Sequence, residues 1–429
     1  MRKYIFDTEN RERVSGAIFD TSAFGNIELL QQGDEILDSQ LDPLWVITEG
    51  GSIFNRPVIE DGVIYFGCCD RKFYAVSIKG KPMWKFDTNG IIISSPCSVG
   101  SLMVFGSYDF NLYALEKKTG RLAWRFPTND KIYSNPCTDG SRIFVGSKDG
   151  NFYCVSTSGR LVWRFRTGGP IETHPLLHKG AVYFGSNDKN LYSLNAETGK
   201  LRWAFKTNSS LRHGMAVLND VIYFGGMEKN IFGVNTEGRK VFSFLMSDLN
   251  SASIITENGI IYIPSRDKNI YAVKPSGEVI WKFQTGHAVE CPAFHKGTLL
   301  FGADDHALYA LNASSGRLLW SFKTNGFMPS TPVVRDDVVY MGGWDCNLYA
   351  LAFSDGRVLW KFQTSSGTQS KFELEQLKPE KHFQVVWSAE DEEKEEENKE
   401  TNITDYGEIK SDYTAGMSKD YVKGKKDYI

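Results

Sequence analysis

The sequence predicts an all-β protein, an eight-bladed β-propeller with four antiparallel strands in each blade; seven blades are the alternative. Three observations predict this fold class. One sequence unit recurs through most of the 429 residues. Each copy contains four short runs rich in Val, Ile, Tyr and Phe, which Gly, Asn, Asp or Pro separate. No window shows a sustained helical period.

A tryptophan marks each copy of the unit, and successive marks lie 39 or 40 residues apart, with Phe242 taking the place once. The marked positions are Trp45, Trp84, Trp124, Trp163, Trp203, Trp281, Trp320 and Trp360. Eight intervals separate the first mark from the last, and each interval holds a full set of three further strands. Nine strands of the tryptophan type for eight blades leave one terminal copy surplus, unless it closes the ring by pairing with the opposite end.

The interval from Trp84 to Trp124 shows the strands in order. Residues 91–95, 102–106 and 112–115 are the first three strands, and the strand around Trp124 is the fourth. Turn residues lie between them, at 88–90, at Asp109 and at 119–120. A single sheet of this kind cannot cover both of its faces. We therefore expect the blades to stack around an axis, with each tryptophan on an outermost strand packing against the next blade.

Eight acidic residues recur between the second and third strands: Asp70, Asp109, Asp149, Asp188, Glu228, Asp267, Asp305 and Asp345. An Asn usually follows two positions later. Asp and Asn cap their own backbone in tight turns. We interpret these residues as turn caps rather than as a metal array, because turns spread around a ring lie too far apart to share an ion.

The repeats divide the chain into four parts. Residues 1–42 form an N-terminal extension, and residues 43–364 form the propeller. Residues 365–388 are a linker that either docks on the ring or stays free. Residues 389–429 form a disordered tail with an acidic run at 390–397, because such a run buries nothing. Asp-Tyr pairs recur in this tail at 405–406, 412–413, 420–421 and 427–428. Chance or a short adhesive motif explains them better than a modification array.

Charge and composition exclude several function classes. The chain has 49 basic and 52 acidic residues and a net charge of −3, so nothing indicates a nucleic-acid partner. No window approaches eighteen apolar residues, and the N-terminus has no apolar core of signal-peptide length, so we expect no membrane span. With seven cysteines that we expect to be reduced, a cytoplasmic monomer is predicted.

Residues 44–364 resemble the repeats of the pyrroloquinoline-quinone (PQQ) propeller family. Segments 116–124, 195–203, 312–320 and 353–360 are similar to the tryptophan-docking motif of that family, and segments such as 182–194 fit its preceding strands. The resemblance implies one of two functions. The family includes quinoprotein alcohol dehydrogenases, and it includes the lipoprotein subunit of the outer-membrane barrel assembly machine, which binds proteins and no cofactor. In character the chain is closer to the second type.

The resemblance to the enzymes implies a quinone held over a tryptophan, with a Ca²⁺ or lanthanide ion, a catalytic Asp and a disulfide between adjacent cysteines. Cys68 and Cys69 invite the comparison, but they occupy a turn position where Gly-Ser-x-Asp stands in other repeats. No cluster matches the metal and catalytic residues of these enzymes. The seven histidines show no zinc-site spacing, and no Gly-rich loop precedes a helix. We expect no cofactor, with PQQ and Ca²⁺ as the alternative.

A functional site in a propeller is expected at positions that vary among its repeats. The two residues before the first strand of each blade vary and are mostly polar. Their chemically distinctive members are Arg56, His174, His213 and Glu290, and Arg212 lies beside them. Two interpretations stay open, hydrated residues near the axis or a funnel that recognises a ligand or peptide. The function predicted is a non-enzymatic scaffold that binds a protein or peptide through its loops or this funnel. A PQQ-dependent or other small-molecule-binding oxidoreductase is the alternative.

Overall fold

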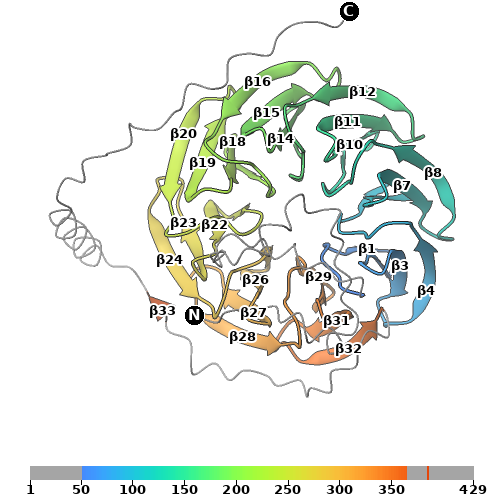
Figure 1. Cartoon of the computed structure of the whole chain (residues 1–429). Coiled ribbons are helices and arrows are strands. Elements are labelled where there is room, and N and C mark those ends of the chain that lie inside the picture. Colours follow the sequence, from blue (N-terminus) through green and yellow to red (C-terminus); the bar gives the residue numbers. More distant parts are fainter. Residues whose placement is uncertain (1–50, 365–383, 386–429) are drawn as a thin grey trace, which may run out of the picture. The chain divides into compact units, whose positions relative to one another are not determined.

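Eight four-stranded blades form a ring in the computed structural model, which describes residues 51–364 and 384–385 (Figure 1). The described residues contain no helix. In each blade the strands follow one another in sequence order, and all neighbours are antiparallel. The predicted eight-bladed propeller is confirmed, and the seven-bladed alternative is wrong. The boundaries at 42 and 388 and the tail from 389 lie outside the described residues and stay predictions.

The strand bounds follow the repeat. Blades 1 to 4 consist of β1 (Val58–Glu60), β2 (Val63–Gly67), β3 (Lys72–Ser77), β4 (Pro82–Asp87); β5 (Cys97–Val99), β6 (Leu102–Gly106), β7 (Asn111–Glu116), β8 (Leu122–Pro127); β9 (Cys137–Thr138), β10 (Arg142–Gly146), β11 (Asn151–Ser156), β12 (Leu161–Arg166); β13 (Leu176–His178), β14 (Ala181–Gly185), β15 (Asn190–Asn195), β16 (Leu201–Lys206). Blades 5 to 8 consist of β17 (Ala216–Leu218), β18 (Val221–Gly225), β19 (Asn230–Asn235), β20 (Lys240–Leu245); β21 (Ile255–Glu257), β22 (Ile260–Pro264), β23 (Asn269–Val273), β24 (Val279–Gln284); β25 (Ala293–His295), β26 (Thr298–Ala303), β27 (Ala307–Asn312), β28 (Leu318–Lys323); β29 (Val333–Arg335), β30 (Val338–Gly342), β31 (Asn347–Ala352), β32 (Val358–Gln363).

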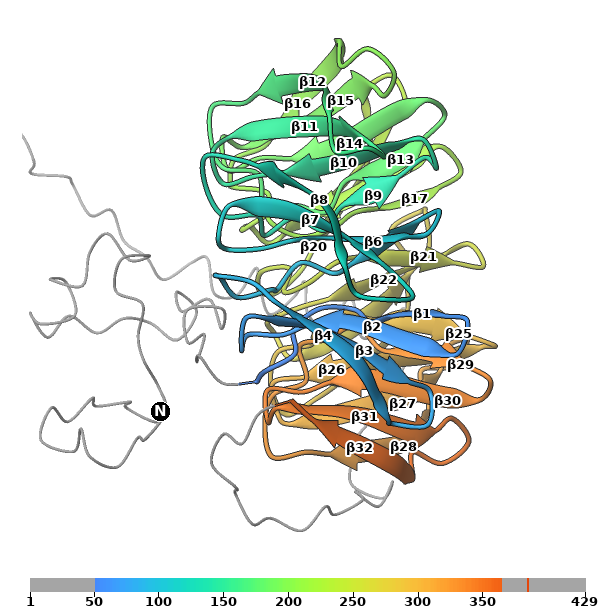
Figure 2. The same cartoon turned by 90° about the vertical axis from the view of Figure 1, so that its right-hand side faces the viewer.

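The first strand of each blade lies nearest the axis and the fourth lies at the rim, and the strands run between the two faces of the ring (Figures 1 and 2). Because the strands alternate in direction, the hairpins between second and third strands share one face with the links between blades. We call this the link face. The opposite face carries the turns between first and second strands and between third and fourth strands, and we call it the turn face.

The hydrophobic core lies between the blades. Eight clusters of buried side chains each join two neighbouring blades, including blades 8 and 1. Phe73 of blade 1 stacks on Phe105 of blade 2 with ring centroids 4.1 Å apart, and Phe152 of blade 3 stacks on Phe184 of blade 4 at 3.9 Å. Each blade therefore depends on both neighbours to cover its apolar faces, which explains why the second and third strands are apolar along most of their length.

The tryptophan of each outer strand contacts the turn face of the next blade, as predicted. In seven of the eight junctions its indole Nε1–H donates to a backbone carbonyl of the turn between third and fourth strands, at 2.8 to 3.3 Å. The indole also lies against the glycine of that turn. A Cβ on Gly159, for example, would come within 2.7 Å of Trp124, and this glycine has φ of 80°, so it is required for two reasons.

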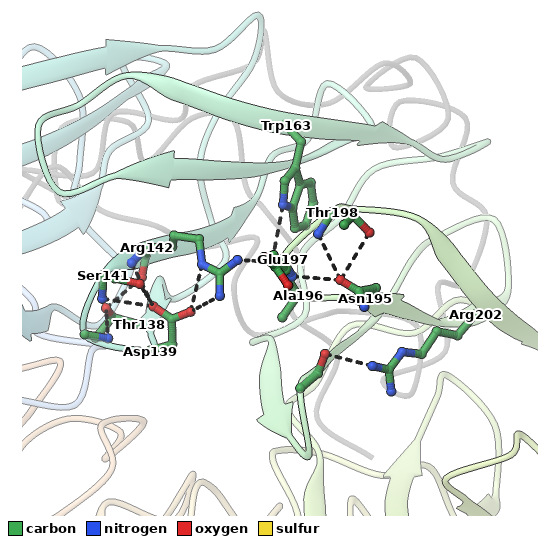
Figure 3. A network of polar contacts seen from close by, with 12 residues as sticks. Thr138, Asp139, Ser141, Arg142, Trp163, Asn195, Ala196, Glu197, Thr198 and Arg202 are labelled. Carbon is green, nitrogen blue, oxygen red and sulfur yellow. Dashed lines mark hydrogen bonds and ion pairs between the residues drawn. The ribbon is translucent and has the colours of Figure 1, made fainter.

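A second donor reinforces some of these contacts. At the junction in Figure 3, Trp163 and Arg142 of blade 3 both donate to the carbonyl oxygen of Ala196 in blade 4, at 3.3 and 3.1 Å. Asp139 orients the Arg142 guanidinium from the same blade. At the junction of blades 1 and 2, Tyr65 Oη–H takes the second place beside Trp84, at 3.2 Å from the carbonyl oxygen of Lys117.

The ring closes through the same contact. Trp360 of blade 8 donates to the carbonyl oxygen of Ile78 in blade 1 at 3.0 Å, and β32 lies beside blade 1 in Figure 1. Ile53 fills the space over Gly342, where a Cβ would meet its side chain at 2.3 Å. Eight complete blades therefore close without the strand around Trp45. Of the two terminal copies, Trp45 is the surplus one, and it lies outside the described residues.

The recurring acidic residues cap turns, as predicted, and they also tie blades together. Asp109 accepts from the backbone N–H of Asn111 at 3.2 Å and from Tyr113 Oη–H at 2.8 Å. The same carboxylate accepts from the backbone N–H of Asn89, in the link that leaves blade 1, at 2.9 Å. Equivalent Tyr-to-Asp bonds occur in seven blades. The array is thus structural.

Blade 5 departs from the repeat at several of these positions. Glu228 and Phe232 replace the Asp and Tyr of the hairpin, Phe242 replaces the docking tryptophan, and Met246 replaces a threonine that follows the outer strand in every other blade. Phe242 has no N–H group, so the junction of blades 5 and 6 lacks the indole hydrogen bond. This junction is therefore the one at which the recurring polar contacts are fewest.

Blade 6 has a fifth strand. β33 (Gln384–Val385) pairs antiparallel with the outer strand β24, with Val385 opposite Lys282 and Gln384 opposite Phe283. The pairing shows that the outer edge of a blade accepts a further strand through backbone hydrogen bonds. Figure 1 shows β33 at the rim, outside β24.

The docking contact predicts a graded loss of stability when the indole N–H is removed. Trp124→Phe leaves the carbonyl of Thr157 without its indole donor, at a cost of about 1–2 kcal/mol in the free energy of unfolding. Trp84→Phe costs less, because the carbonyl of Lys117 keeps its bond from Tyr65. Both changes remove the same ring volume, so the difference isolates the hydrogen bond. Urea unfolding of the two variants measures it, and equal losses would contradict the assignment.

Candidate functional site

A ring of polar residues surrounds the axis where the links enter the first strands. Two positions of each blade contribute to it. The first position holds Asn55, Ser94, Ser134, Thr173, His213, Ala252, Glu290 and Ser330. The second position holds Arg56, Ser95, Asn135, His174, Gly214, Ser253, Cys291 and Thr331.

Several first-position side chains join neighbouring blades. Ser94 Oγ–H donates to the carbonyl oxygen of Ser134 at 3.0 Å, and Ser134 Oγ–H donates to that of Thr173 at 2.7 Å. Ser330 Oγ–H does the same across the closure of the ring, to the carbonyl oxygen of Asn55 at 2.7 Å. These hydroxyls are buried and fully used in holding the inner strands together. They are structural residues rather than binding residues.

The second position forms a belt in which each backbone N–H donates to the side chain of the next blade. Arg56 donates to Ser95 Oγ at 2.9 Å, Ser95 to Asn135 Oδ1 at 2.6 Å, and Asn135 to His174 Nδ1 at 3.2 Å. Gly214 follows His174 and has no side chain that can accept. The belt is therefore interrupted between blades 4 and 5, where the His174 ring instead lies against Gly214, with Cδ2 within 3.2 Å of where a Cβ would stand.

An ionic cluster lies beside this interruption. Glu172 is buried, with 8% of its surface exposed, and it lies one residue before the first ring position. Lys148 Nζ, from the hairpin of blade 3, lies 2.9 Å from Glu172 Oε1. Arg212 Nε, from the link into blade 5, lies 3.4 Å from Glu172 Oε2. One buried carboxylate thus faces two cations, and the cluster spans blades 3 to 5 on the link face.

Two histidines stand next to the ionic cluster. Burial lowers the pKa of His174 to about 4, and the neighbouring His213 lowers it further. Burial also lowers the pKa of His213 to about 4, and the positive charges of Arg266 and Arg212 add to this effect. Both rings are therefore neutral at pH 7. His213 Nε2 is buried and has no hydrogen-bond partner among the described residues.

Aromatic side chains gather on the other side of the link face. Trp344, in the hairpin of blade 8, lies 4.7 Å from Phe327 and 5.8 Å from Phe54, measured between ring centroids. His306, in the hairpin of blade 7, meets Phe327 edge-on at 5.0 Å. We call these four residues the aromatic cluster; all four are half-buried. Half-buried aromatic rings offer apolar contact area and π faces to a partner.

The structure brings together three of the five residues that the sequence singled out. His174, Arg212 and His213 belong to the region of the ionic cluster. Arg56 lies in blade 1 and Glu290 in blade 7, so neither joins them. Arg56 is exposed, yet protein surrounds it closely enough for desolvation to lower the pKa of its guanidinium. Glu290 is buried, with 9% of its surface exposed, and its backbone N–H donates to the carbonyl oxygen of Gly302.

Sequence reasoning missed Glu172, Lys148 and the aromatic cluster. The signal was present one position earlier, since Phe54, Glu172 and Arg212 share a place in their repeats that varies as widely as the ring positions. The residue before the hairpin Asp varies too, and it is Lys148 in blade 3 and Trp344 in blade 8.

The residues near the axis do not fit the quinone and Ca²⁺ of the dehydrogenases. Cys68 and Cys69 are free thiols, both buried, and burial raises their pKa values, which keeps them protonated. The nearest buried acid, Glu172, already faces two cations. Among residues 51–364, no three His, Cys, Asp or Glu side chains gather closely enough to hold a metal ion. What the cluster offers chemically is charge and aromatic surface for recognition.

Comparison with known proteins agrees with the fold. The family model described as outer membrane protein assembly factor BamB matches residues 24–135, 127–243 and 266–388. Two solved structures are similar. BamB from Moraxella catarrhalis has 19% identity and a TM-score of 0.59, covering 73% of this chain and 95% of that one. The computationally designed Ika8 protein has 15% identity and a TM-score of 0.64, covering 74% and 98%. No curated protein matches.

The lowered pKa values predict a loss of stability in acid. Folded His174 and His213 bind protons near pH 4, whereas the unfolded chain binds them near pH 6.5. Their contribution is thus complete above pH 6.5 and is lost as pH falls toward 4, by about 1–2 kcal/mol for each ring after allowance for partial exposure. Unfolding free energies measured across this window should fall less steeply in the double variant His174→Asn, His213→Gln. Asn suits the first site, because Asn135 already serves as the acceptor there in blade 3. Parallel curves would contradict the assignment.

Proposed function

Because the chain belongs to the BamB-like family of PQQ-repeat propellers, we propose that it is a non-enzymatic scaffold that binds a protein partner through its link face. The observation that carries the proposal is the asymmetry of this face. The ionic cluster stands over blades 3 to 5, and the aromatic cluster stands over blades 7, 8 and 1. The repeat does not require either cluster, since equivalent positions in other blades hold unrelated residues.

The two clusters suit a peptide or protein surface better than a small molecule. Aromatic and Arg side chains are the residues that most often contribute large shares of binding energy in protein interfaces. The clusters come from opposite parts of the ring, so a partner that uses both must extend across the axis. The family model is described by an assembly factor, which supports a role in holding proteins together.

The proposal includes no quinone and no metal cofactor. Free, protonated Cys68 and Cys69 and the paired Glu172 support this part. In the part of the chain that the structure describes, no helix is long and apolar enough to cross a membrane. A cytoplasmic location and a monomeric state stay predictions.

Capture experiments with matched variants test the proposal. Full-length protein is used as bait in a lysate of its source organism, and captured proteins are quantified for wild type, for Trp344→Ala and for Lys296→Ala. Trp344 is the centre of the aromatic cluster, whereas Lys296 is an exposed residue of the turn face. A partner that uses the link face should be depleted at least about tenfold by Trp344→Ala and retained by the control. A partner list that Trp344→Ala leaves unchanged would contradict the proposal.

Reconstitution tests the absence of a cofactor. The purified chain is mixed with PQQ and Ca²⁺, and absorbance and dye reduction are recorded with an alcohol present. We expect no bound chromophore and no turnover. A stable chromophore with turnover would replace the scaffold by the oxidoreductase.

A further inference from the structure

The junction of blades 5 and 6 contains a tryptophan-docking slot that holds no tryptophan. In the other seven blades an indole covers the glycine of the turn between third and fourth strands, at Gly80, Gly120, Gly159, Gly199, Gly238, Gly316 and Gly356. The equivalent glycine of blade 6 is Gly277. It has the same left-handed backbone, with φ of 94°, and a Cβ added to it would meet nothing within 4 Å.

Phe242 leaves this slot open because its ring is too short. Phe242 is buried, packs edge-on against Tyr223 with centroids 5.2 Å apart, and does not approach Gly277. It also has no N–H group. The carbonyl of Pro275, which corresponds to the acceptor Thr157 of blade 3, therefore receives no bond from blade 5. The chain itself shows seven times which group fits such a slot, an indole whose N–H meets a turn carbonyl.

The outer strand of blade 5 is unusually apolar beside the slot. Leu245 ends β20 with 69% of its surface exposed, and Val241 has 53% exposed. The residues equivalent to Leu245 in the other blades are Asp87, Pro127, Arg166, Lys206, Gln284, Lys323 and Gln363, none of them an aliphatic side chain. β20 is the last strand of its sheet, so its outer edge pairs with no described strand.

The edge of such a strand accepts an added strand, as β24 of blade 6 does with β33. Side chains of an added strand point alternately to the two faces of the sheet. Phe242 faces blade 6, so Val241 and Leu245 lie on the opposite face of β20. A strand added to β20 can therefore direct one side chain toward the Gly277 slot while its neighbours in sequence lie on the side of Val241 and Leu245.

We propose that the rim of blade 5 binds, by strand addition to β20, an extended segment of a partner protein that carries a tryptophan between apolar residues, with the indole in the slot at Gly277. Main-chain hydrogen bonds to β20 supply affinity, and the slot supplies specificity for indole. This site lies at the rim and is separate from the link face of the proposed function, so each can fail without the other.

A peptide taken from the chain itself tests the proposal. The probe is a fluorescently labelled peptide with the sequence of residues 317–324, which carries Trp320 between Leu319 and Ser321 and fills the equivalent slot of blade 8. The control peptide has Phe at the tryptophan position. Fluorescence anisotropy with the full-length chain should show binding of the tryptophan peptide that is at least about tenfold tighter than that of the control, as expected from the loss of one hydrogen bond and its stacked area. Equal binding of the two peptides would overturn the proposal.

Three variants locate the site. Phe242→Trp fills the slot from within the chain and should abolish the preference for the tryptophan peptide. Trp203→Phe empties the matching slot at Gly238 and should add a second binding site. Leu245→Lys, which introduces the residue that blades 4 and 7 have there, should weaken binding without altering the thermal midpoint. Undiminished binding by both Phe242→Trp and Leu245→Lys would overturn the proposal.

One further arm separates a partner from the chain's own C-terminal sequence, which contains Trp387 three residues after Gln384. Trp387→Phe should leave the affinity for the tryptophan peptide unchanged. If wild type fails to bind the peptide and Trp387→Phe binds it, the slot belongs to the chain itself and the partner is ruled out.

Discussion

The contact between an indole and the glycine turn of the next blade is the interaction on which the ring depends. A four-stranded blade has two apolar faces and no means to cover either alone, so the apolar clusters form only between blades. Burial of this kind has no direction. The indole N–H and the left-handed glycine give it one, because the ring fits only where the glycine leaves space and the carbonyl points toward it. The same contact joins Trp360 to Ile78 and closes the ring without exchange of a strand.

The repeat explains why the fold could be predicted from sequence and the site could not. Trp84, Gly120 and Asp109 recur because each blade needs them, so their period shows the architecture directly. The same logic hides function, since residues that recur are structural. The prediction that the hairpin acids cap turns was right, although sequence alone could not show that Asp109 also grips the link from blade 1.

The ring of variable polar residues proved to be two things. Ser94, Ser134 and Ser330 vary in type but share a task, because any short hydroxyl side chain can reach the next carbonyl. His174 and Arg212 differ in kind, and the reason lies in Gly214, which interrupts the belt and makes room for a histidine ring. The partner of Arg212, Glu172, is forty positions away in sequence, at the same repeat position in the preceding blade. Only the ring geometry brings the two side chains together.

Blade 5 shows what the repeat can lose. Phe242, Phe232 and Met246 remove three polar contacts from one junction, yet the core cluster between blades 5 and 6 remains complete. Apolar packing therefore holds the junction, and the missing contacts leave an open slot at Gly277. A structural residue that is absent from one repeat can thus mark a site as clearly as an unusual residue that is present.

Hydrogen exchange of four glycine amides tests this view of the docking contact most directly. Gly80, Gly159, Gly238 and Gly277 each donate to a carbonyl three residues earlier in the same kind of turn, at 2.8 to 3.0 Å. An indole covers the first three and leaves Gly277 bare. In the free protein, the Gly277 amide should exchange at least about tenfold faster than the other three, because local opening there breaks no docking contact. Equal protection of all four amides would contradict the claim that the indole contact holds the blades together.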